Sequence, residues 1–205
     1  MKPGKIILIV LLFVITIGLA QPSWADRISE DSPDYPKVVQ TLNSLMQVRK
    51  NPEQIGYTAE ELQQKIAALE LQKQTMETSE DWARCRNETG KPLAIYARKP
   101  ENSTRNSLYY LGHGETTDED WDCDAIYLPN DAKVAGLKLP IGEPAILKII
   151  DGTQLVAKTN PNTQELEFIA PTALIEVLKA EQLNWQIPNL ASSDIDVQSP
   201  NAPSD

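Results

Sequence analysis

The chain has 205 residues, of which 41% are hydrophobic and 23% are charged, and its net charge is −10. This length and composition suit one folded domain with an appendage, and they exclude a fibrous, collagen-like or wholly disordered protein. The acidity argues against a general nucleic-acid-binding protein, because neutralising phosphates needs a basic surface. A single histidine leaves little scope for histidine-based catalysis or for a metal site built from several histidines.

The first 25 residues have the features of a Sec-type signal peptide. Lys2 and Lys5 precede an apolar stretch over residues 6–20, and Ser23 and Ala25 are small residues before a cleavage point. The apolar stretch is shorter than the roughly 20 residues that a membrane-spanning helix needs. Cleavage would remove 25 residues and two lysines, leaving 180 residues with 17 basic and 29 acidic side chains. We therefore expect an exported protein without an integral membrane span, with an uncleaved N-terminal anchor as the alternative.

Two amphipathic helices are predicted next. Residues 26–34 are polar and predict a flexible leader, and Asp34 is a candidate N-cap for a helix that ends before Asn51-Pro52. Thr58 and Glu61 form a capping box that opens a second helix. Helical spacing places one apolar stripe on each helix, with the members Val38, Leu42, Leu45 and Met46 on the first and Leu62, Ile66, Leu69 and Met76 on the second. Residues 35–80 therefore predict a helical hairpin, which is too small to bury a core alone and must pack on the rest of the chain or bind a partner.

The composition becomes β-rich from residue 81 onward. Short strands are predicted at residues 93–97, 107–111, 125–128, 145–150, 154–159 and 165–169. Asp151-Gly152, between two apolar runs, predicts a β-hairpin. Residues 171–183 predict a last helix, and residues 188–205 predict a disordered tail. The predicted fold class is α+β, with the N-terminal helical hairpin followed over residues 81–187 by a small antiparallel β-sandwich or barrel.

The two cysteines, Cys85 and Cys123, are predicted to form one structural disulfide. Two lone cysteines in an exported protein most often do so, and closing this loop stabilises a fold by about 4 kcal/mol in the chain-entropy model. The alternative is a pair of free buried thiols. A redox role would need a C-x-x-C motif or a thiol of lowered pKa, and the sequence indicates neither.

A run of acidic residues precedes and follows Cys123. Asp120, Asp122 and Asp124 alternate, and Asp131 follows Asp120 by eleven positions, which resembles positions 1, 3, 5 and 12 of a calcium-binding loop. Ala125 stands where such loops need glycine, and an aspartate replaces the bidentate glutamate at the last position. The alternative is a solvent-exposed acidic loop or strand edge. Calcium is the one cofactor that the sequence suggests.

Candidate binding and catalytic residues are few. Trp82, Trp121, Tyr109 and Tyr110 are candidate stacking surfaces for a small ligand or a glycan. His113 lies between two glycines, which is typical of a turn, and a hydrolase would need it beside a carboxylate or beside a hydroxyl such as Ser103 or Ser107. We assign no catalytic residue.

Two turns resemble those of known β-sandwich domains. The segment 85–96, CRNETGKPLAIY, is similar to the N-x-T-G-K turn that leads into the first strand of many such domains, and YLGHGET at 110–116 is similar to the L-x-x-G-E-T turn that follows. With the signal peptide, the helical hairpin and the Trp-Asp-Cys-Asp segment, the whole chain resembles a group of exported cyanobacterial proteins. That resemblance implies the periplasm or the thylakoid lumen. The segment 143–147, with its proline before a strand, is also similar to the end of a thioredoxin-like domain, which would here lack the redox motif.

These observations favour a non-enzymatic accessory or interaction protein of an exported compartment. We expect a protein partner at a membrane complex, contacted through the exposed face of the hairpin and the acidic loop around Trp121. The alternatives are a small-ligand or glycan-binding module, a thioredoxin-like domain without redox chemistry, and a hydrolase that uses His113.

Overall fold

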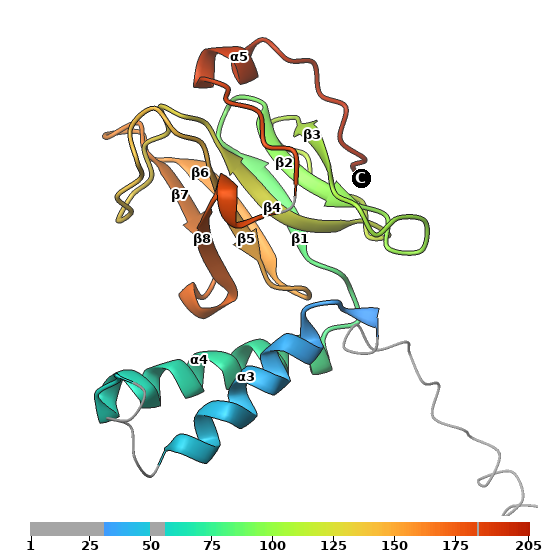
Figure 1. The fold of residues 1–205 in the computed structure, drawn as a ribbon. Helices are drawn as coiled ribbons and strands as arrows, with labels where there is room; N and C mark the ends of the chain where they lie inside the picture. Colours follow the sequence, from blue (N-terminus) through green and yellow to red (C-terminus); the bar gives the residue numbers. More distant parts are fainter. Residues whose placement is uncertain (1–30, 50–55, 184) are drawn as a thin grey trace, which may run out of the picture.

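The computed structural model describes residues 31–49, 56–183 and 185–205, so the predicted signal peptide lies outside the described residues. Helices α3 (Tyr35–Val48) and α4 (Ala59–Thr78) form a helical hairpin that lies beneath two β-sheets (Figure 1). The predicted α+β fold with a helical hairpin and a sandwich-like β-domain is confirmed. Within these ranges, no helix is both long enough and apolar enough to cross a membrane.

The hairpin is held together by the two apolar stripes predicted from its sequence, with one exception: Met46, predicted on the first stripe, is 47% exposed. Leu42, Leu62 and Ile66 form a buried cluster between the two helices. The capping box is confirmed, because the Thr58 hydroxyl accepts a hydrogen bond from the Glu61 amide and the Glu61 carboxylate accepts one from the Thr58 amide. These bonds satisfy amides that would otherwise lack partners at the start of α4.

A second cluster attaches the hairpin to the sheets. Val38 from α3 and Met76 from α4 are buried against Ile150 and Leu174 of the β-domain. The side-chain amide of Gln72 also donates to the backbone carbonyl of Ala173 at 2.6 Å. The part of the hairpin near these residues is therefore anchored, whereas the distal cluster contains hairpin residues only.

The two sheets have different strand directions. The larger sheet has the order β3-β2-β4-β5-β8, and every neighbouring pair is antiparallel. In the smaller sheet, β1-β6-β7, the β1–β6 pair is parallel and the β6–β7 pair is antiparallel. The strands are β1 (Arg84–Glu88), β2 (Leu93–Arg98), β3 (Ser107–Leu111), β4 (Asp122–Leu128), β5 (Ala145–Ile149), β6 (Gln154–Thr159), β7 (Leu166–Ile169) and β8 (Ile175–Lys179).

The main hydrophobic core takes residues from both sheets. The predicted disulfide between Cys85 and Cys123 is present within this core, where it connects β1 to β4. It therefore links the two sheets covalently.

The β-hairpin predicted at Asp151-Gly152 is wrong, because β5 and β6 lie in different sheets. The residues do form a turn, in which the Thr153 amide donates to the Ile150 carbonyl at 3.1 Å. Gly152 has φ +85° but Asp151 does not have a positive φ, whereas the type I′ turn of a two-residue hairpin requires positive φ at both central residues. A turn of this other kind splays the two strands, and here it carries the chain from one sheet to the other.

The helix predicted over residues 171–183 is also wrong. The segment contains two single 3-10 turns, η2 (Thr172–Leu174) and η3 (Ala180–Gln182), on either side of strand β8. The β-branched residues Ile175 and Val177 favour an extended strand, and β8 pairs with β5 at the edge of the larger sheet. This strand occupies the place where the thioredoxin-like alternative expects a helix.

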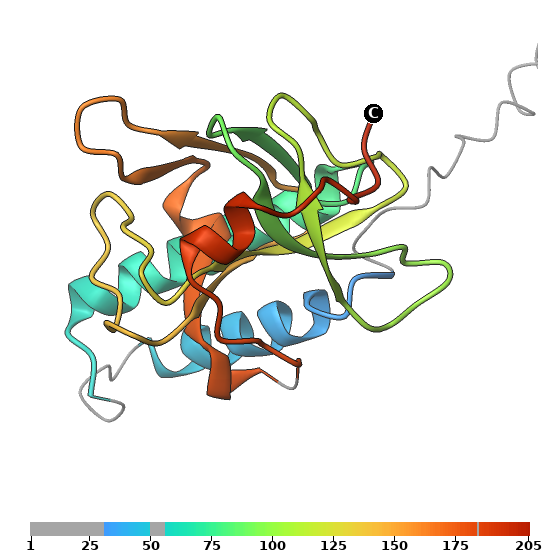
Figure 2. The same cartoon turned by 90° about the horizontal axis from the view of Figure 1, so that it is seen from above.

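The disordered tail predicted for residues 188–205 is replaced by ordered structure. The segment contains helix α5 (Ser192–Asp196) and runs along the sheets on the side away from the hairpin (Figures 1 and 2). Ile195 is buried with Tyr96 and Tyr127 of the larger sheet, and Ser204 makes an isolated bridge with Thr117. The tail is ordered because its few apolar side chains cover the outer face of that sheet.

Candidate functional site

The candidate site begins at an irregularity in the central strand β4. The register between β2 and β4 shifts between Tyr96 and Ala97, which leaves Asp124 as an extra residue on β4. Such a bulge changes the direction of neighbouring side chains. Asp122 and Asp124, on either side of the disulfide cysteine, are both buried.

Arg98, on β2, pairs with both of these aspartates. Its Nη2 lies 2.7 Å from Oδ2 of Asp122, and its Nε lies 3.2 Å from Oδ2 of Asp124. The guanidinium also lies over the ring of Trp82, 5.3 Å from its centroid. Arg98 is itself buried, so these contacts replace the interactions with water that its guanidinium would otherwise make.

The hairpin contributes Asp34 to the same region. This residue occupies the predicted N-cap position of α3, but its side chain makes no capping hydrogen bond. Its carboxylate instead lies 2.5 Å from Nζ of Lys148 on β5 and 3.1 Å from Nζ of Lys37. The amide of Tyr35 is satisfied by the Ser32 hydroxyl at 3.2 Å. The sequence thus predicted the position of Asp34 correctly and missed its ion pair with the sheet.

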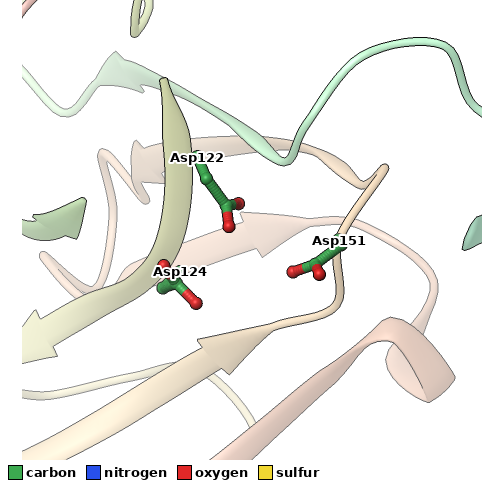
Figure 3. A group of neighbouring side chains, drawn as sticks. All are labelled: Asp122, Asp124 and Asp151. Carbon is green, nitrogen blue, oxygen red and sulfur yellow. The ribbon is translucent and has the colours of Figure 1, made fainter. Parts of the chain in front are cut away.

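Asp151, in the turn after β5, completes what we call the buried charge cluster, consisting of Asp34, Arg98, Asp122, Asp124, Lys148 and Asp151. The carboxylates of Asp122, Asp124 and Asp151 converge from two segments of the sheet region (Figure 3). One oxygen from each lies within 4.8 Å of the others. Among the described residues, Oδ1 of Asp122 and both oxygens of Asp151 are buried without a hydrogen-bond partner at normal distance and angle, and the Ser32 hydroxyl interacts weakly with the Asp151 carboxylate.

Burial raises the pKa of three of these carboxyl groups. It raises the pKa of Asp122 well above its usual range, and the charges of Asp124 and Asp151 add to the effect. The pKa of Asp124 is raised to about 6, and that of Asp151 is also raised, in both cases chiefly by burial. Burial alone would raise the pKa of Asp34 too, but the ammonium groups of Lys148 and Lys37 together lower it. The three converging carboxylates are therefore poorly compensated, because desolvation disfavours their charged forms.

The four residues of the predicted calcium-like loop are not brought together. Asp122 and Asp124 lie in the buried charge cluster, but the Asp120 side chain is 65% exposed and pairs with Lys99 at 2.9 Å. Asp131 follows β4 and contacts the start of α5, where its carboxylate accepts hydrogen bonds from the amide and hydroxyl of Ser192.

Asp34, Arg98, Lys148 and Asp151 were not predicted as site residues. A signal for Lys148 was available, since it is the one charged residue in the apolar run AILKII at 145–150. A lysine in a buried strand needs a partner. Nothing in the sequence indicated which acids would supply that partner.

The four predicted aromatic binding residues do not form a common surface. Trp121 and Tyr109 contact each other edge to face, with centroids 5.5 Å apart, and pack against the main core. Tyr110 packs against the opposite face of the larger sheet, and Trp82 covers Arg98. The packing of Trp121 and Tyr109 on the core that holds the disulfide favours a structural role for that pair.

His113 lies on an exposed turn, where its Nδ1 accepts a hydrogen bond from the Gly90 amide at 3.1 Å. No hydrogen bond joins it to Ser103 or Ser107 in the described part of the chain. The hydrolase hypothesis requires a nucleophile within hydrogen-bond reach of His113, and neither of the two predicted serines supplies one.

A cleft of about 570 Å³ lies beside the buried charge cluster, and Trp82 and Arg98 belong to its lining. Three acidic residues, Asp31, Glu80 and Glu101, also line it. Arg98 thus borders both the cleft and the buried carboxylates.

Comparison with known proteins adds no relative, because no family model, curated protein or solved structure matches this chain.

Proposed function

We propose that the protein is an exported, non-enzymatic accessory protein that uses its helical hairpin to contact a protein partner of a membrane complex. One observation carries this proposal. The distal cluster of the hairpin, around Leu42, Leu62 and Ile66, contains hairpin residues only, and the hairpin lies outside the two packed sheets (Figure 1). The distal part of the hairpin therefore projects from the β-domain and does not cover its core.

The hairpin carries exposed apolar side chains that a partner can bury. Met46 on α3 is 47% exposed and Leu71 on α4 is 37% exposed. Burial of such side chains is the dominant favourable term in most protein association. The other end of the hairpin is anchored to the sheets by Val38 and Met76 and by the ion pair between Asp34 and Lys148, so the hairpin has a defined direction.

Export is part of the same proposal. The disulfide between Cys85 and Cys123 is compatible with an oxidising compartment, because such bonds are rare where thiols are kept reduced. N-terminal sequencing of the native protein tests this part. We expect the chain to begin at Asp26, and an intact Met1 would overturn cleavage of the signal peptide.

Cross-linking in native membranes, followed by affinity purification and mass spectrometry, tests the partner. We compare the wild type with the double variant Met46→Glu and Leu71→Glu, and with the control Ile169→Glu, whose site on β7 is 54% exposed and lies away from the hairpin. We expect a cross-linked protein that is recovered with the wild type and the control and is lost with the double variant. If nothing is recovered with the wild type, or if recovery is the same for all three, the proposal fails.

A further inference from the structure

We propose that the carboxylates of Asp122, Asp124 and Asp151 form a binding site for one divalent cation that prefers oxygen ligands. The site is distinct from the calcium-like loop in the sequence, because Asp120 and Asp131 lie elsewhere on the surface.

The separation of the three carboxylates fits a single ion. Two oxygens that bind one calcium ion at about 2.4 Å are at most about 4.8 Å apart. One oxygen from each of the three aspartates lies within 4.8 Å of the other two. The three side chains also point toward one another from β4 and from the turn after β5 (Figure 3).

Asp151 supplies an independent observation that points to a ligand. Its side chain is directed at Asp122 and Asp124 (Figure 3), and the residue is only 1% exposed. Among the described residues, neither carboxylate oxygen has a hydrogen-bond partner at normal distance and angle, and the Ser32 hydroxyl interacts with this carboxylate only weakly. Leaving a buried polar group unsatisfied costs about 1–3 kcal/mol, and more for a charged group. A cation between the three carboxylates would satisfy these oxygens and the free Oδ1 of Asp122.

The balance of charge in the cluster agrees with a divalent ion. Arg98 pairs with Asp122 and Asp124 through one oxygen of each, and Lys148 pairs with Asp34. The two buried cations face four buried carboxylates, and the exposed Lys37 is a further partner of Asp34. The cluster therefore keeps a net negative charge when all four carboxylates are ionised, and a divalent cation would compensate it.

The available ligand atoms select the class of ion. Carboxylate oxygens suit calcium, magnesium and manganese, whereas zinc and copper favour imidazole or thiolate ligands. Both cysteines are joined in the disulfide, and His113 lies on an exposed turn, so neither contributes here. The cleft lined by Asp31, Glu80 and Glu101 lies beside Arg98, and an acidic cleft raises the local concentration of cations.

The test is a calorimetric titration of the full oxidised chain after treatment with a chelator. Ca²⁺, Mg²⁺ and Mn²⁺ are titrated separately into the wild type, Asp151→Asn and the control Asp120→Asn. We expect one ion per chain to bind to the wild type and to the control, and the dissociation constant to rise at least tenfold in Asp151→Asn. Because asparagine has nearly the same shape as aspartate, we expect this variant to fold, and circular dichroism checks that it does. If it does not fold, Asp124→Asn is used in the same comparison.

Three outcomes overturn the proposal. In the first, none of the three ions binds the wild type at millimolar concentration. In the second, the loss of affinity occurs in Asp120→Asn instead of Asp151→Asn, which would move the site to the exposed acidic loop. In the third, Asp151→Asn binds the ions with the same affinity as the wild type. The experiment involves no partner, so its result is separate from that of the cross-linking test.

Discussion

Replacing Lys148 by methionine tests whether the buried charge cluster fastens the hairpin to the sheet. Methionine keeps most of the length of the lysine side chain but removes its charge. Lys148 is largely buried, and its Nζ lies 2.5 Å from Oδ2 of Asp34. The change leaves Asp34 buried without its main partner and leaves Arg98 as the one buried cation among four carboxylates. Removing one member of a buried ion pair costs about 3–5 kcal/mol, and we expect Lys148→Met to lower the free energy of unfolding by that amount.

Urea unfolding at pH 7 in the presence of a chelator measures this loss without interference from bound ions. Lys158→Met is the matched control, because Lys158 lies on β6, is half-exposed, and pairs with Glu88 at 3.1 Å on the surface. An exposed pair of this kind contributes about 0–1 kcal/mol. If the two lysine variants lose the same free energy, the cluster does not fasten the hairpin and the reasoning is refuted.

A double-mutant cycle isolates the contact itself. Asp34→Asn is combined with Lys148→Met, and the loss in the double variant is compared with the sum of the two single losses. Residues in one ion-pair network show interaction energies of about 0.5–3 kcal/mol. We expect the double variant to lose less than that sum, because removing Asp34 also removes the charge that Lys148→Met leaves unpaired.

Two further changes test the disulfide and the turn after β5, which hold the segments of the site in place. Replacing Cys85 and Cys123 together by alanine removes a cross-link with a sequence separation of 38 residues. We expect urea unfolding to show a free energy of unfolding that is lower by about 4 kcal/mol. A loss below about 1 kcal/mol would contradict the idea that the disulfide stabilises the fold by restricting the unfolded chain. Gly152→Ala should lower the melting temperature more than Gly142→Ala. Both glycines have positive φ, but a Cβ at Gly152 would lie 2.6 Å from Oγ of Ser79, whereas one at Gly142 would meet nothing within 4 Å. The backbone strain common to both is about 1–2 kcal/mol, and equal shifts in melting temperature would show that the contact with Ser79 is easily relieved.

Local signals in the sequence were sufficient to predict the hairpin. Its apolar spacing and the capping box at Thr58 and Glu61 depend on neighbours within one helical turn. The capping box was correct, and the spacing was correct except for Met46, which is exposed. The same local reasoning failed at Asp151-Gly152, because the dipeptide specifies a turn but not which strands pair. That outcome depends on the conformation of Asp151 and on the close packing of the turn against the end of α4.

The errors over residues 171–183 and 188–205 have a tertiary cause. The strand β8 exists because the edge of β5 is available for pairing, which overrides a weak helical pattern. The C-terminal segment is ordered because it covers Tyr96 and Tyr127, residues far away in the sequence. A polar composition with a few well-placed apolar residues therefore does not by itself indicate disorder.

The site shows the same limit in a sharper form. Asp122 and Asp124 were chosen from the sequence for their spacing, and that spacing suggested ligands from a single loop. In the structure they face Asp151, 27 positions after Asp124, and the bulge in β4 that positions Asp124 is visible only in the pairing with β2. The alternation of acids along a strand normally marks a solvated face, but here both acids are buried and the solvated member of the run is Asp120. Acidic residues next to a disulfide cysteine can therefore be buried together with that cysteine. In this chain the lone Lys148 in an apolar strand was the best available sign that such charges exist.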